Sequence, residues 1–522
     1  MRKATNLLIL LLPAIGWSIS GPHLAKPNFS LTDSLYSGLP SNGVTQIALQ
    51  GDSLICLATG GGLSRTSDFG ATIVSYYSGM NNLPRGGISA IAVRDSIIWV
   101  AGVFDSNTVK GEMQTGGGLA YSRDNGQTWH FVAQPIDAAD DRYGLWDGDT
   151  VEFLPIVTPV NNTTWDIALT DDYAYIVSWA GGIRRTKDWG QTWERLVLPP
   201  DGDDRLECGE PITFKVNPRD PPEGNHNHKG FSVLAYNDTV WVGTANGINL
   251  GIVESTDCIR WRKYTARNSA ISGNFVVALG RQLYKGQETI WAVTLPAEGA
   301  GEYQAVSKTS DGGLTWSTTL VGERAYSFAF DDSIAYVCTD RGLFKSIDSE
   351  NWAVYTPIAD TTRQEYIYSQ HAYAAEVDKR EGVTYLWVGT GDGLAKTRDD
   401  GLHWRVYRTS LSTADAGQPD IYAYPNPFSP THHNILNGDG HVRIQYNLTK
   451  PALVMLEVFN FAMERVYRSE WFSIPAAGDY NLPWNGRASN GEIVANGVYF
   501  CKLTRRKGDK DKEFWTKLIV VK

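Results

Sequence analysis

Short apolar runs separated by glycine-rich turns dominate roughly the first four-fifths of the chain. Residues 240–248 (VWVGTANGI) and 386–394 (LWVGTGDGL) each contain a strand-like run, a turn and the start of a second run. Alternating apolar positions bounded by Gly, Asn and Asp predict β-strands of four to seven residues rather than helices. Related runs at 175–183 and 335–343 indicate that one all-β unit is repeated along the chain.

An eight-residue motif follows these runs and sets the period of the repeat. A complete copy is residues 122–129 (SRDNGQTW), so the pattern is Ser/Thr-x-Asp-x-Gly-x-Thr-Trp. Two of the seven copies are one residue shorter and lack the glycine, namely those at Asp257 and Asp348. Successive motif aspartates are on average about 55 residues apart, enough for a four-stranded blade of a β-propeller with some insertions. The seven aspartates are Asp68, Asp124, Asp188, Asp257, Asp311, Asp348 and Asp399.

The chemistry of the motif predicts a turn rather than a catalytic site. A hydroxyl and a carboxylate two residues apart can accept hydrogen bonds from the amides of their own turn. Glycine provides a positive φ where a tight hairpin needs one. The tryptophan then begins the next strand with a large apolar side chain that can pack between neighbouring sheets. We therefore expect each motif aspartate to have a structural role.

Seven motifs with seven sets of upstream strands predict a seven-bladed β-propeller over residues 28–409. Residues 404–407 (WRVY) supply a fourth strand for the last blade, so the ring can close without strand exchange; residues 29–36 are the candidate if one is exchanged. The motif resembles the Asp-box, or bacterial neuraminidase repeat, of β-propellers. Sialidases of that kind also carry an Arg-Ile-Pro motif, which is absent here. Asp-box xyloglucan hydrolases use two propellers, whereas this chain has one.

Three long insertions are expected on the face opposite the motifs, clustered around blade three. They are residues 103–117, 133–163 and 198–229. Loops on a rigid scaffold often carry binding residues. The candidate ligand-binding residues are Tyr143, Trp146, His226 and His228. Aromatic rings there would stack on a sugar or peptide, or would only hold the loop in place.

Acidic pairs in the same insertions raise the question of a metal. Asp147 with Asp149, and Asp201 with Asp203, offer the oxygen ligands that Ca²⁺ prefers. The alternative is two solvated acidic loops that bind nothing. Two histidines at 226 and 228 would face a metal in an extended segment, but no third ligand has motif spacing. No other cofactor is indicated.

The last hundred residues change in character after a polar linker at 410–420. Residues 421–522 contain 13 Lys and Arg against 9 Asp and Glu, whereas the rest of the chain contains 34 against 48. Alternating runs at 442–448, 453–459, 498–503 and 514–521 predict a small β-sandwich of the Ig type.

Three motifs in this segment carry a second resemblance. They are residues 424–428 (YPNPF), 484–487 (WNGR) and 496–500 (NGVYF), followed by a basic end at 517–522. The segment resembles the C-terminal sorting domain of type IX secretion cargo, which is similar to the Ig-like domain of the flagellar hook-capping protein. One departure is Asn485, where the hook-capping pattern usually has Asp. The resemblance implies a bacterium with an outer membrane, whose secretion machinery binds residues 421–522.

Residues 1–20 have the charge and apolar pattern of a cleaved signal peptide. No other run is long enough to span a membrane, so we expect none in the mature chain. A net charge of −10 without a basic stripe argues against nucleic-acid binding. Five cysteines without a CxxC pair argue against a disulfide-rich framework, although Cys208 and Cys258 are placed so that they could pair.

Two classes of function follow. The favoured hypothesis is an exported, non-catalytic propeller at the cell surface or in the medium that binds an extracellular glycan, peptide or protein. The alternative is an extracellular glycoside hydrolase or lyase of sialidase-like fold, because paired carboxylates for such chemistry can be hidden among the acidic loops. The motifs of common hydrolases and nucleotide-binding enzymes are absent.

Overall fold

The computed structural model describes residues 35–51, 54–297, 299–355, 357–380, 382–507 and 510–522. The chain divides into two compact units, the first ending at Thr409 and the second running from Ser410 to Lys522. The predicted signal peptide lies outside the described residues, as does most of the candidate exchange strand at 29–36.

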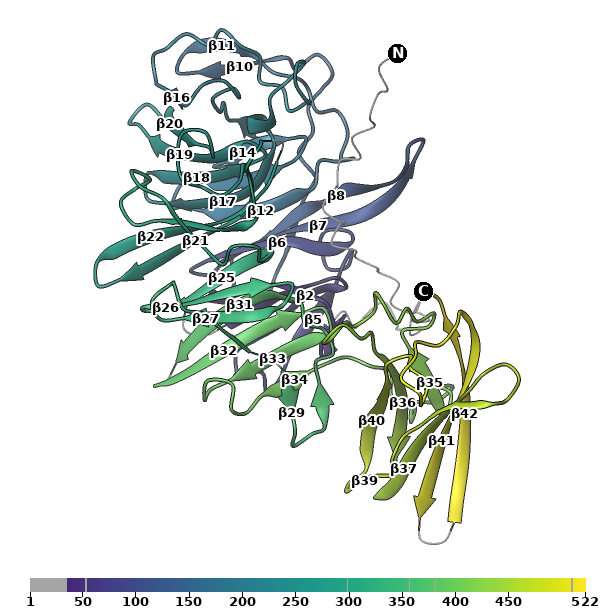
Figure 1. Ribbon diagram of the computed structural model, residues 1–522. Helices are drawn as coiled ribbons and strands as arrows, with labels where there is room; N and C mark the ends of the chain where they lie inside the picture. Colours follow the sequence, from purple (N-terminus) through teal and green to yellow (C-terminus); the bar gives the residue numbers. More distant parts are fainter. Residues whose placement is uncertain (1–34, 52–53, 298, 356, 381, 508–509) are drawn as a thin grey trace, which may run out of the picture. The chain divides into compact units, whose positions relative to one another are not determined.

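The first unit is built from seven antiparallel sheets in chain order, which we call blades one to seven (Figure 1). Blade one contains β1 (Leu35–Ser37), β2 (Val44–Gln50), β3 (Leu54–Thr59), β4 (Gly62–Thr66) and β5 (Val74–Tyr77). Blade two contains β6 (Gly87–Arg94), β7 (Ile97–Thr108), β8 (Gly111–Ser122) and β9 (His130–Val132). Blade three contains β12 (Thr164–Leu169), β13 (Ala174–Ser178), β14 (Gly182–Thr186) and β15 (Glu194–Arg195).

The remaining blades follow the same order from the inner to the outer strand. Blade four contains β17 (Gly230–Tyr236), β18 (Thr239–Thr244), β19 (Gly247–Val253) and β20 (Ile259–Tyr264), with β16 (Arg205–Leu206) added at its outer edge. Blade five contains β21 (Phe275–Tyr284), β22 (Gln287–Leu295), β23 (Ala305–Thr309) and β24 (Ser317–Thr319). Blade six contains β25 (Ala325–Asp331), β26 (Ile334–Thr339), β27 (Gly342–Ser346) and β28 (Ala353–Tyr355). Blade seven contains β31 (Ala372–Arg380), β32 (Val383–Thr390), β33 (Gly393–Thr397) and β34 (Arg405–Tyr407).

The innermost strands close the ring. Each one lies against the innermost strand of the next blade, and β31 of blade seven lies against β2 of blade one. The fold is therefore the predicted all-β, seven-bladed propeller. Blade seven takes its fourth strand from β34, as predicted for residues 404–407. Strand β1, at the end of the candidate exchange segment, instead pairs with β5 at the outer edge of blade one.

A β-bulge interrupts every innermost strand at the same level of the ring. In each case one residue near the start of the strand lacks a partner on the second strand. Bulges of this kind bend the strand and redirect a side chain. The unpaired residues are Thr45, Ser89, Trp165, Phe231, Val277, Tyr326 and Tyr373.

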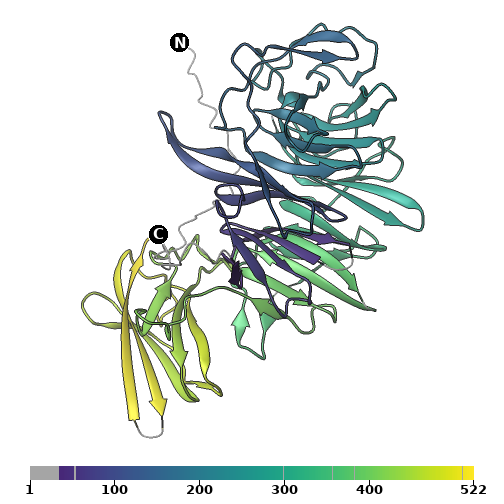
Figure 2. The same ribbon diagram turned by 180° about the vertical axis from the view of Figure 1, so that it is seen from behind.

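Additional elements occur in the connections. The hairpin of β10 (Tyr143–Trp146) and β11 (Asp149–Glu152) and the 3₁₀ turn η1 (His226–His228) belong to the insertions around blades three and four, and β29 (Ala359–Asp360) pairs with β30 (Glu365–Tyr366). The predicted insertion at 103–117 lengthens β7 and β8 into the hairpin coloured blue in Figure 2.

The second unit is a two-sheet sandwich. One sheet has the order β35 (Ile421–Tyr424), β36 (Val442–Leu448), β40 (Gly478–Trp484). The other has the order β38 (Arg465–Arg468), β37 (Ala452–Phe459), β41 (Gly497–Lys507), β42 (Lys510–Val520), with β39 (Phe472–Ile474) also pairing with β37. Its core contains the buried Phe428, Tyr446 and Trp484. The predicted linker is attached to this unit, because the Ser412 hydroxyl donates to Asp479 at 2.7 Å.

Candidate functional site

Six of the seven motif turns share one set of hydrogen bonds. In the copy at Asp124, the Ser122 hydroxyl donates to the carboxylate at 2.7 Å and accepts from the Gly126 amide at 2.8 Å. The carboxylate also accepts from the Thr128 amide at 2.9 Å and from the Thr128 hydroxyl at 2.6 Å. Equivalent sets surround Asp68, Asp188, Asp311, Asp348 and Asp399.

These bonds stabilise the charged form of the motif aspartates. Burial opposes ionisation of Asp124, but hydrogen bonds from Thr128 outweigh it and lower the pKa to about 2. Hydrogen bonds from Thr315 likewise lower the pKa of Asp311 to about 2. A carboxylate whose oxygens are occupied by its own turn, and whose pKa is depressed, is unsuited to act as a general acid or base near neutral pH.

The fourth motif copy does not follow the expected turn. Asp257 itself has a positive φ of 65°, and its carbonyl accepts a hydrogen bond from Arg185 at 2.8 Å. Burial and a hydrogen bond to the Asp257 carboxylate raise the pKa of Tyr173 to about 12. Here the aspartate itself takes the left-handed position, whereas in the equally short copy at Asp348 the following residue, Ser349, takes it with φ of 64°.

The motif tryptophans of five blades each contact an aromatic ring of the blade before. Trp193 of blade three meets Trp99 of blade two edge-to-face, with ring centroids 6.3 Å apart. Trp316 of blade five meets Trp241 of blade four in the same way at 6.3 Å. The same arrangement joins Trp129 to Tyr76, Trp352 to Trp291 and Trp404 to Tyr355. The motif thus supports the ring by hydrogen bonds within a turn and aromatic packing between blades.

The insertions around blade three cover the scaffold instead of forming an open loop face. The insertion at 133–163, called the first insertion below, pairs with the insertion at 198–229, called the second insertion, through a parallel bridge between Phe153 and Val216. Strand β16 of the second insertion continues along the outer edge of blade four, where Leu206 pairs with Trp261. The expectation that both insertions stay on the face opposite the motifs is therefore wrong.

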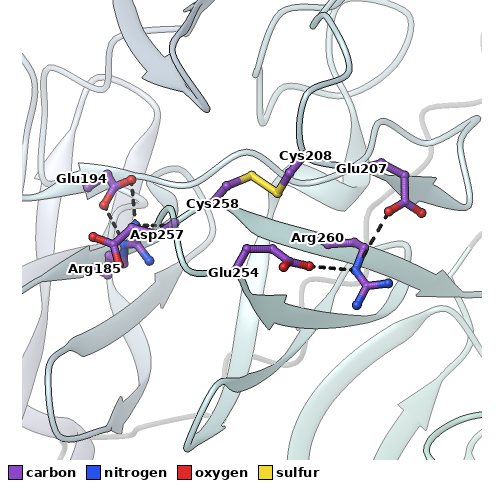
Figure 3. Close-up of a disulfide and its surroundings, with 8 residues drawn as sticks. All are labelled: Arg185, Glu194, Glu207, Cys208, Glu254, Asp257, Cys258 and Arg260. Atoms are coloured by element: carbon purple, nitrogen blue, oxygen red, sulfur yellow. Dashed lines mark hydrogen bonds and ion pairs between the residues drawn. A yellow bond between two sulfur atoms is a disulfide. The ribbon is translucent and has the colours of Figure 1, made fainter.

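A disulfide fixes this cover to blade four. Cys208 of the insertion is bonded to Cys258 of the fourth motif turn, as drawn in Figure 3. Ion pairs flank the bond, with Arg260 3.2 Å from Glu254 and Arg185 2.6 Å from Glu194. The pairing left open by the sequence is thus present, and Cys56, Cys338 and Cys501 are buried free thiols.

Trp146 and Tyr143 have opposite environments. Tyr143 is 62% exposed and Leu145 is 70% exposed, so one side of the β10–β11 hairpin faces solvent. Trp146 is only 5% exposed and belongs to an apolar cluster with residues of blades three and four, including Val177 and Val242. The hypothesis that Trp146 contacts a ligand is wrong, because its ring fills the core beneath the hairpin.

The proposed Ca²⁺ ligands do not converge. Asp147 and Gly148 form the tight turn between β10 and β11, with φ of 45° and 89°, and Asp149 is exposed in the strand that follows. The described acidic and sulfur side chains bring Asp147 together with Cys208 and Cys258, but a disulfide sulfur is a poor metal ligand. Asp149 is not part of that group.

The second acidic pair and the histidines have structural partners. The carboxylate of Asp201 accepts the amides of His226 and Asn227 at 2.9 and 2.8 Å, whereas Asp203 is exposed. His228 is 2% exposed, with its ring nitrogens beside Asn217 and the Leu198 carbonyl, and burial lowers its pKa to about 4. His226 lies 3.1 Å from the Lys229 ammonium. These contacts order the insertion at 198–229, and none of these four residues belongs to a group of three His, Cys, Asp or Glu ligands among the described residues.

A groove of about 350 Å³ lies between blades four and five. Its walls come from the connection after β20, the loop between β22 and β23, and the start of β24. Tyr303 is 42% exposed, its amide donates to the Ser272 carbonyl at 2.9 Å, and the hydroxyls of Ser317 and Thr318 also line the space. This connection and this loop lie on the face opposite the motif turns.

The groove contains one carboxylate, and that carboxylate holds the loop. Glu302 accepts from the Asn274 side chain at 2.6 Å, from the Asn274 amide at 3.1 Å and from the Ala297 amide at 2.7 Å. No other charged side chain is among the described residues that line it. An aromatic face with neutral hydroxyls suits an uncharged polar ligand of the size that pockets of 300–1,000 Å³ accept.

Two carboxyl groups elsewhere have the perturbed pKa values expected of acid catalysts. Burial raises the pKa of Asp166 to about 7, and burial also raises that of Glu376 to about 7. Asp166 accepts the amides of Ile167 and Val233, each at 2.9 Å. The two groups sit on blades three and seven, with blades one and two between them around the ring, so they do not form a hydrolase pair.

The groove was not predicted from the sequence. Its lining comes from three short segments, 266–272, 300–303 and 317–318, none of which carries a recognisable motif. An exposed tyrosine beside serines and threonines is common in loops, so no local signal distinguishes it.

Comparison with known proteins supports the C-terminal part of this architecture. Residues 431–509 match the family model of the FlgD Ig-like domain, in agreement with the predicted resemblance of this segment. None of the curated proteins matches the chain. Among the described residues, no helix is both long and apolar enough to cross a membrane.

Several solved propeller-containing structures are similar to the chain at low sequence identity. PorZ, described as a surface component of the type-IX secretion system of Porphyromonas gingivalis, is 14% identical with a TM-score of 0.30, over 92% of this chain and 75% of that one. The extracellular domain of the putative one component system BT4673 from B. thetaiotaomicron is 11% identical with a TM-score of 0.29, over 92% and 86%. YCF48 from Cyanidioschyzon merolae is 14% identical with a TM-score of 0.37, over 72% and 99%.

Proposed function

We propose that the protein is an exported binding propeller of Asp-box type that holds a neutral saccharide in the groove between blades four and five. The observation that carries the proposal is the composition of the groove: an exposed tyrosine ring, serine and threonine hydroxyls, and a single described carboxylate that already accepts hydrogen bonds from Asn274 and Ala297. Sugars present apolar ring faces and many hydroxyls, so stacking on Tyr303 and hydrogen bonds to neutral groups would suit them.

Export is supported by features of both units. Disulfides persist in oxidising compartments outside the cytoplasm, and Cys208–Cys258 is such a bond. The FlgD-like segment at 431–509 lies inside the region that resembles sorting domains of secreted cargo. We propose that the signal peptide directs the chain across the inner membrane and residues 421–522 across the outer membrane. The mature protein is then at the cell surface or in the medium.

The hydrolase alternative is less well supported by the geometry. Glycoside hydrolysis generally uses two carboxyl groups about 5 to 9.5 Å apart on either side of the scissile bond. Within its described lining the groove offers only Glu302, whose oxygens accept two hydrogen bonds from Asn274 and one from the Ala297 amide. Binding without bond cleavage is therefore the function that this site supports best.

An array of neutral oligosaccharides followed by calorimetric titration tests the proposal. Tyr303→Ala should weaken the best ligand about tenfold or more, equivalent to about 1.4 kcal/mol. Tyr143→Ala is the matched control, because Tyr143 is also an exposed tyrosine of the propeller but lies on the β10–β11 hairpin. Loss of binding in Tyr143→Ala alone would move the site to the hairpin. Release of reducing ends by the wild-type protein would favour the hydrolase instead.

A further inference from the structure

One face of the C-terminal sandwich carries an exposed aromatic cluster that lies outside its hydrophobic core. Residues on the outer side of the β37–β41–β42 sheet align by register, with Phe459 opposite Phe500 and Phe500 opposite Lys517. In the adjacent row Lys502 is opposite Trp515. Together with Phe461, which follows β37, these residues form what we call the aromatic face: Phe459, Phe461, Phe500, Lys502, Trp515 and Lys517.

The rings of the aromatic face pack against one another and remain open to solvent. Phe459 and Trp515 have centroids 5.5 Å apart, and the Lys502 ammonium lies 5.6 Å from the first ring and 5.7 Å from the second. Trp515 is 45% exposed and Phe461 is 78% exposed. The core of the sandwich lies on the other side of the sheet, where Leu456, Leu503 and Leu518 are almost fully buried. Exposed clusters of large rings on a small domain mark interaction sites.

Electrostatics around the aromatic face narrow the choice of partner. Glu457, beneath the cluster, pairs with Lys502 at 2.6 Å and with Arg465 at 2.8 Å, and Lys502 also lies 3.3 Å from Glu513. Lys517 is exposed and has no ion pair among the described residues. With Arg468 also within 4.0 Å of Glu457, four cations face two carboxylates. Two copies docked symmetrically through this face would bring these excess positive charges together, which disfavours a homodimer.

A protein surface fits this arrangement better than a lipid headgroup layer. Lipid recognition by charge uses clusters of about four to eight unpaired basic residues. Here Arg465, Arg468 and Lys502 all lie within 4.0 Å of Glu457, which leaves Lys517 as the one cation of this group without an ion pair among the described residues, and aromatic anchors occupy the centre. Aromatic anchors surrounded by a polar rim are typical of protein–protein hot spots.

We infer that the aromatic face is the docking surface by which residues 421–522 bind an acidic protein surface of the outer-membrane export machinery. This inference rests on the proposed sorting role of the segment and assigns that role to specific side chains. Trp515 and Phe461 supply the apolar contact, and Lys517 supplies the charge that selects an acidic partner.

Export of full-length variants in the native bacterium tests the inference. Trp515→Ala combined with Lys517→Glu should reduce the protein at the cell surface and in the medium about tenfold, the effect of losing a hot spot. The variant should accumulate in the periplasm. Leu453→Ala is the matched control and should be exported normally, because Leu453 is 38% exposed at the other end of the same sheet face, beside the Arg506–Asp511 pair. Wild-type export of the double variant would overturn the inference.

Three further measurements separate the alternatives. Phe461→Ser lies in an exposed turn and should reduce export while leaving the thermal unfolding of the purified chain unchanged, so misfolding cannot account for the effect. Deletion of residues 421–522 tests the sorting role itself. Normal export of the deletion variant would refute that role. If the deletion variant is not exported but the point variants are, only the role of the aromatic face is refuted. Sedimentation with phosphatidylglycerol vesicles tests a membrane, and binding that is lost in the double variant would contradict a protein partner.

Discussion

Replacing Trp146 distinguishes a ligand-binding role for the hairpin from a structural one. Trp146 is 5% exposed within the cluster that joins the insertions to blades three and four. Truncation of a buried Trp or Phe to Ala typically costs about 3–5 kcal/mol, because transfer free energy is lost and a cavity remains. We expect Trp146→Ala to destabilise the propeller within that range. Saccharide affinity should be unchanged, since the groove lies between blades four and five.

Trp146→Phe provides an internal control on the same site. The indole Nε1 of Trp146 is buried and has no hydrogen-bond partner among the described residues. A phenyl ring removes that unsatisfied donor but leaves a smaller void, so the two effects oppose each other. We expect the cost of Trp146→Phe to be below about 1.5 kcal/mol.

Denaturant unfolding checks both values, with the two units fitted as separate transitions because a single two-state fit is not justified for a two-domain chain. Limited proteolysis within residues 133–163 would reveal loss that is confined to the insertion. An unchanged midpoint and unchanged proteolysis for Trp146→Ala, together with weakened ligand binding, would refute the packing argument.

Three further predictions concern charge and covalent links. The stability difference between wild type and Asp311→Asn should be constant above about pH 4. This stability difference should disappear as the pH falls through about 2, because hydrogen bonds from Thr315 depress the folded-state pKa of Asp311. A difference in melting temperature that persists at about pH 1.5 would contradict this. Asn485→Asp should lower the free energy of unfolding of the sandwich, measured by urea denaturation, by about 1–2 kcal/mol. The Asn485 amide donates to Asp439 at 3.0 Å, and a carboxylate in its place would repel Asp439. A stabilised variant would show that this amide is dispensable. Replacing both Cys208 and Cys258 by serine should lower the free energy of unfolding by up to about 4 kcal/mol, given the 50-residue separation of the two cysteines. Equal unfolding midpoints of the wild-type protein with and without reductant would contradict this.

Repetition made the architecture predictable. Local patterns recur seven times along the propeller, so each copy supports the strand assignment of the others. In the sandwich, which lacks this repeat, the predicted strand at 442–448 also coincides with β36. The motif glycines take positive φ as expected, for example 77° at Gly126, but the residue before each of them does so as well, as at Asn125 with 60°. The sequence gives no sign of that second left-handed residue because Asn, Phe, Trp and Asp all occupy the position.

The candidate site was less predictable, because its geometry depends on contacts between distant segments. A tryptophan in an acidic, turn-rich insertion looks like a ligand contact when the partner strands are unknown. Trp146 is buried because residues of the insertion at 198–229, more than fifty positions later, pack beside it. Phe153 of the insertion at 133–163 is bridged to Val216 of that later insertion. The same limitation applies to Tyr303, whose neighbours in the groove are contributed by two other segments.

Side-chain contacts help to close the ring between blade seven and blade one. No strand of one terminus joins the last blade, so no backbone ladder connects blade seven to blade one among the described residues. Asn42 instead donates to the Thr409 carbonyl at 3.0 Å and accepts from its amide at 2.7 Å, so one side chain reproduces the paired bonds of a ladder. The Arg380 guanidinium lies 4.2 Å from the Phe69 ring in the first motif turn, and Lys396 donates to the Phe69 carbonyl. The motif turn of blade one thus has a second role: beyond stabilising its own hairpin, it presents a ring and a carbonyl to cations of blade seven. These polar and cation–π contacts add to an apolar cluster that also spans the joint, in which Val44 and Ile73 of blade one pack with Trp387 of blade seven.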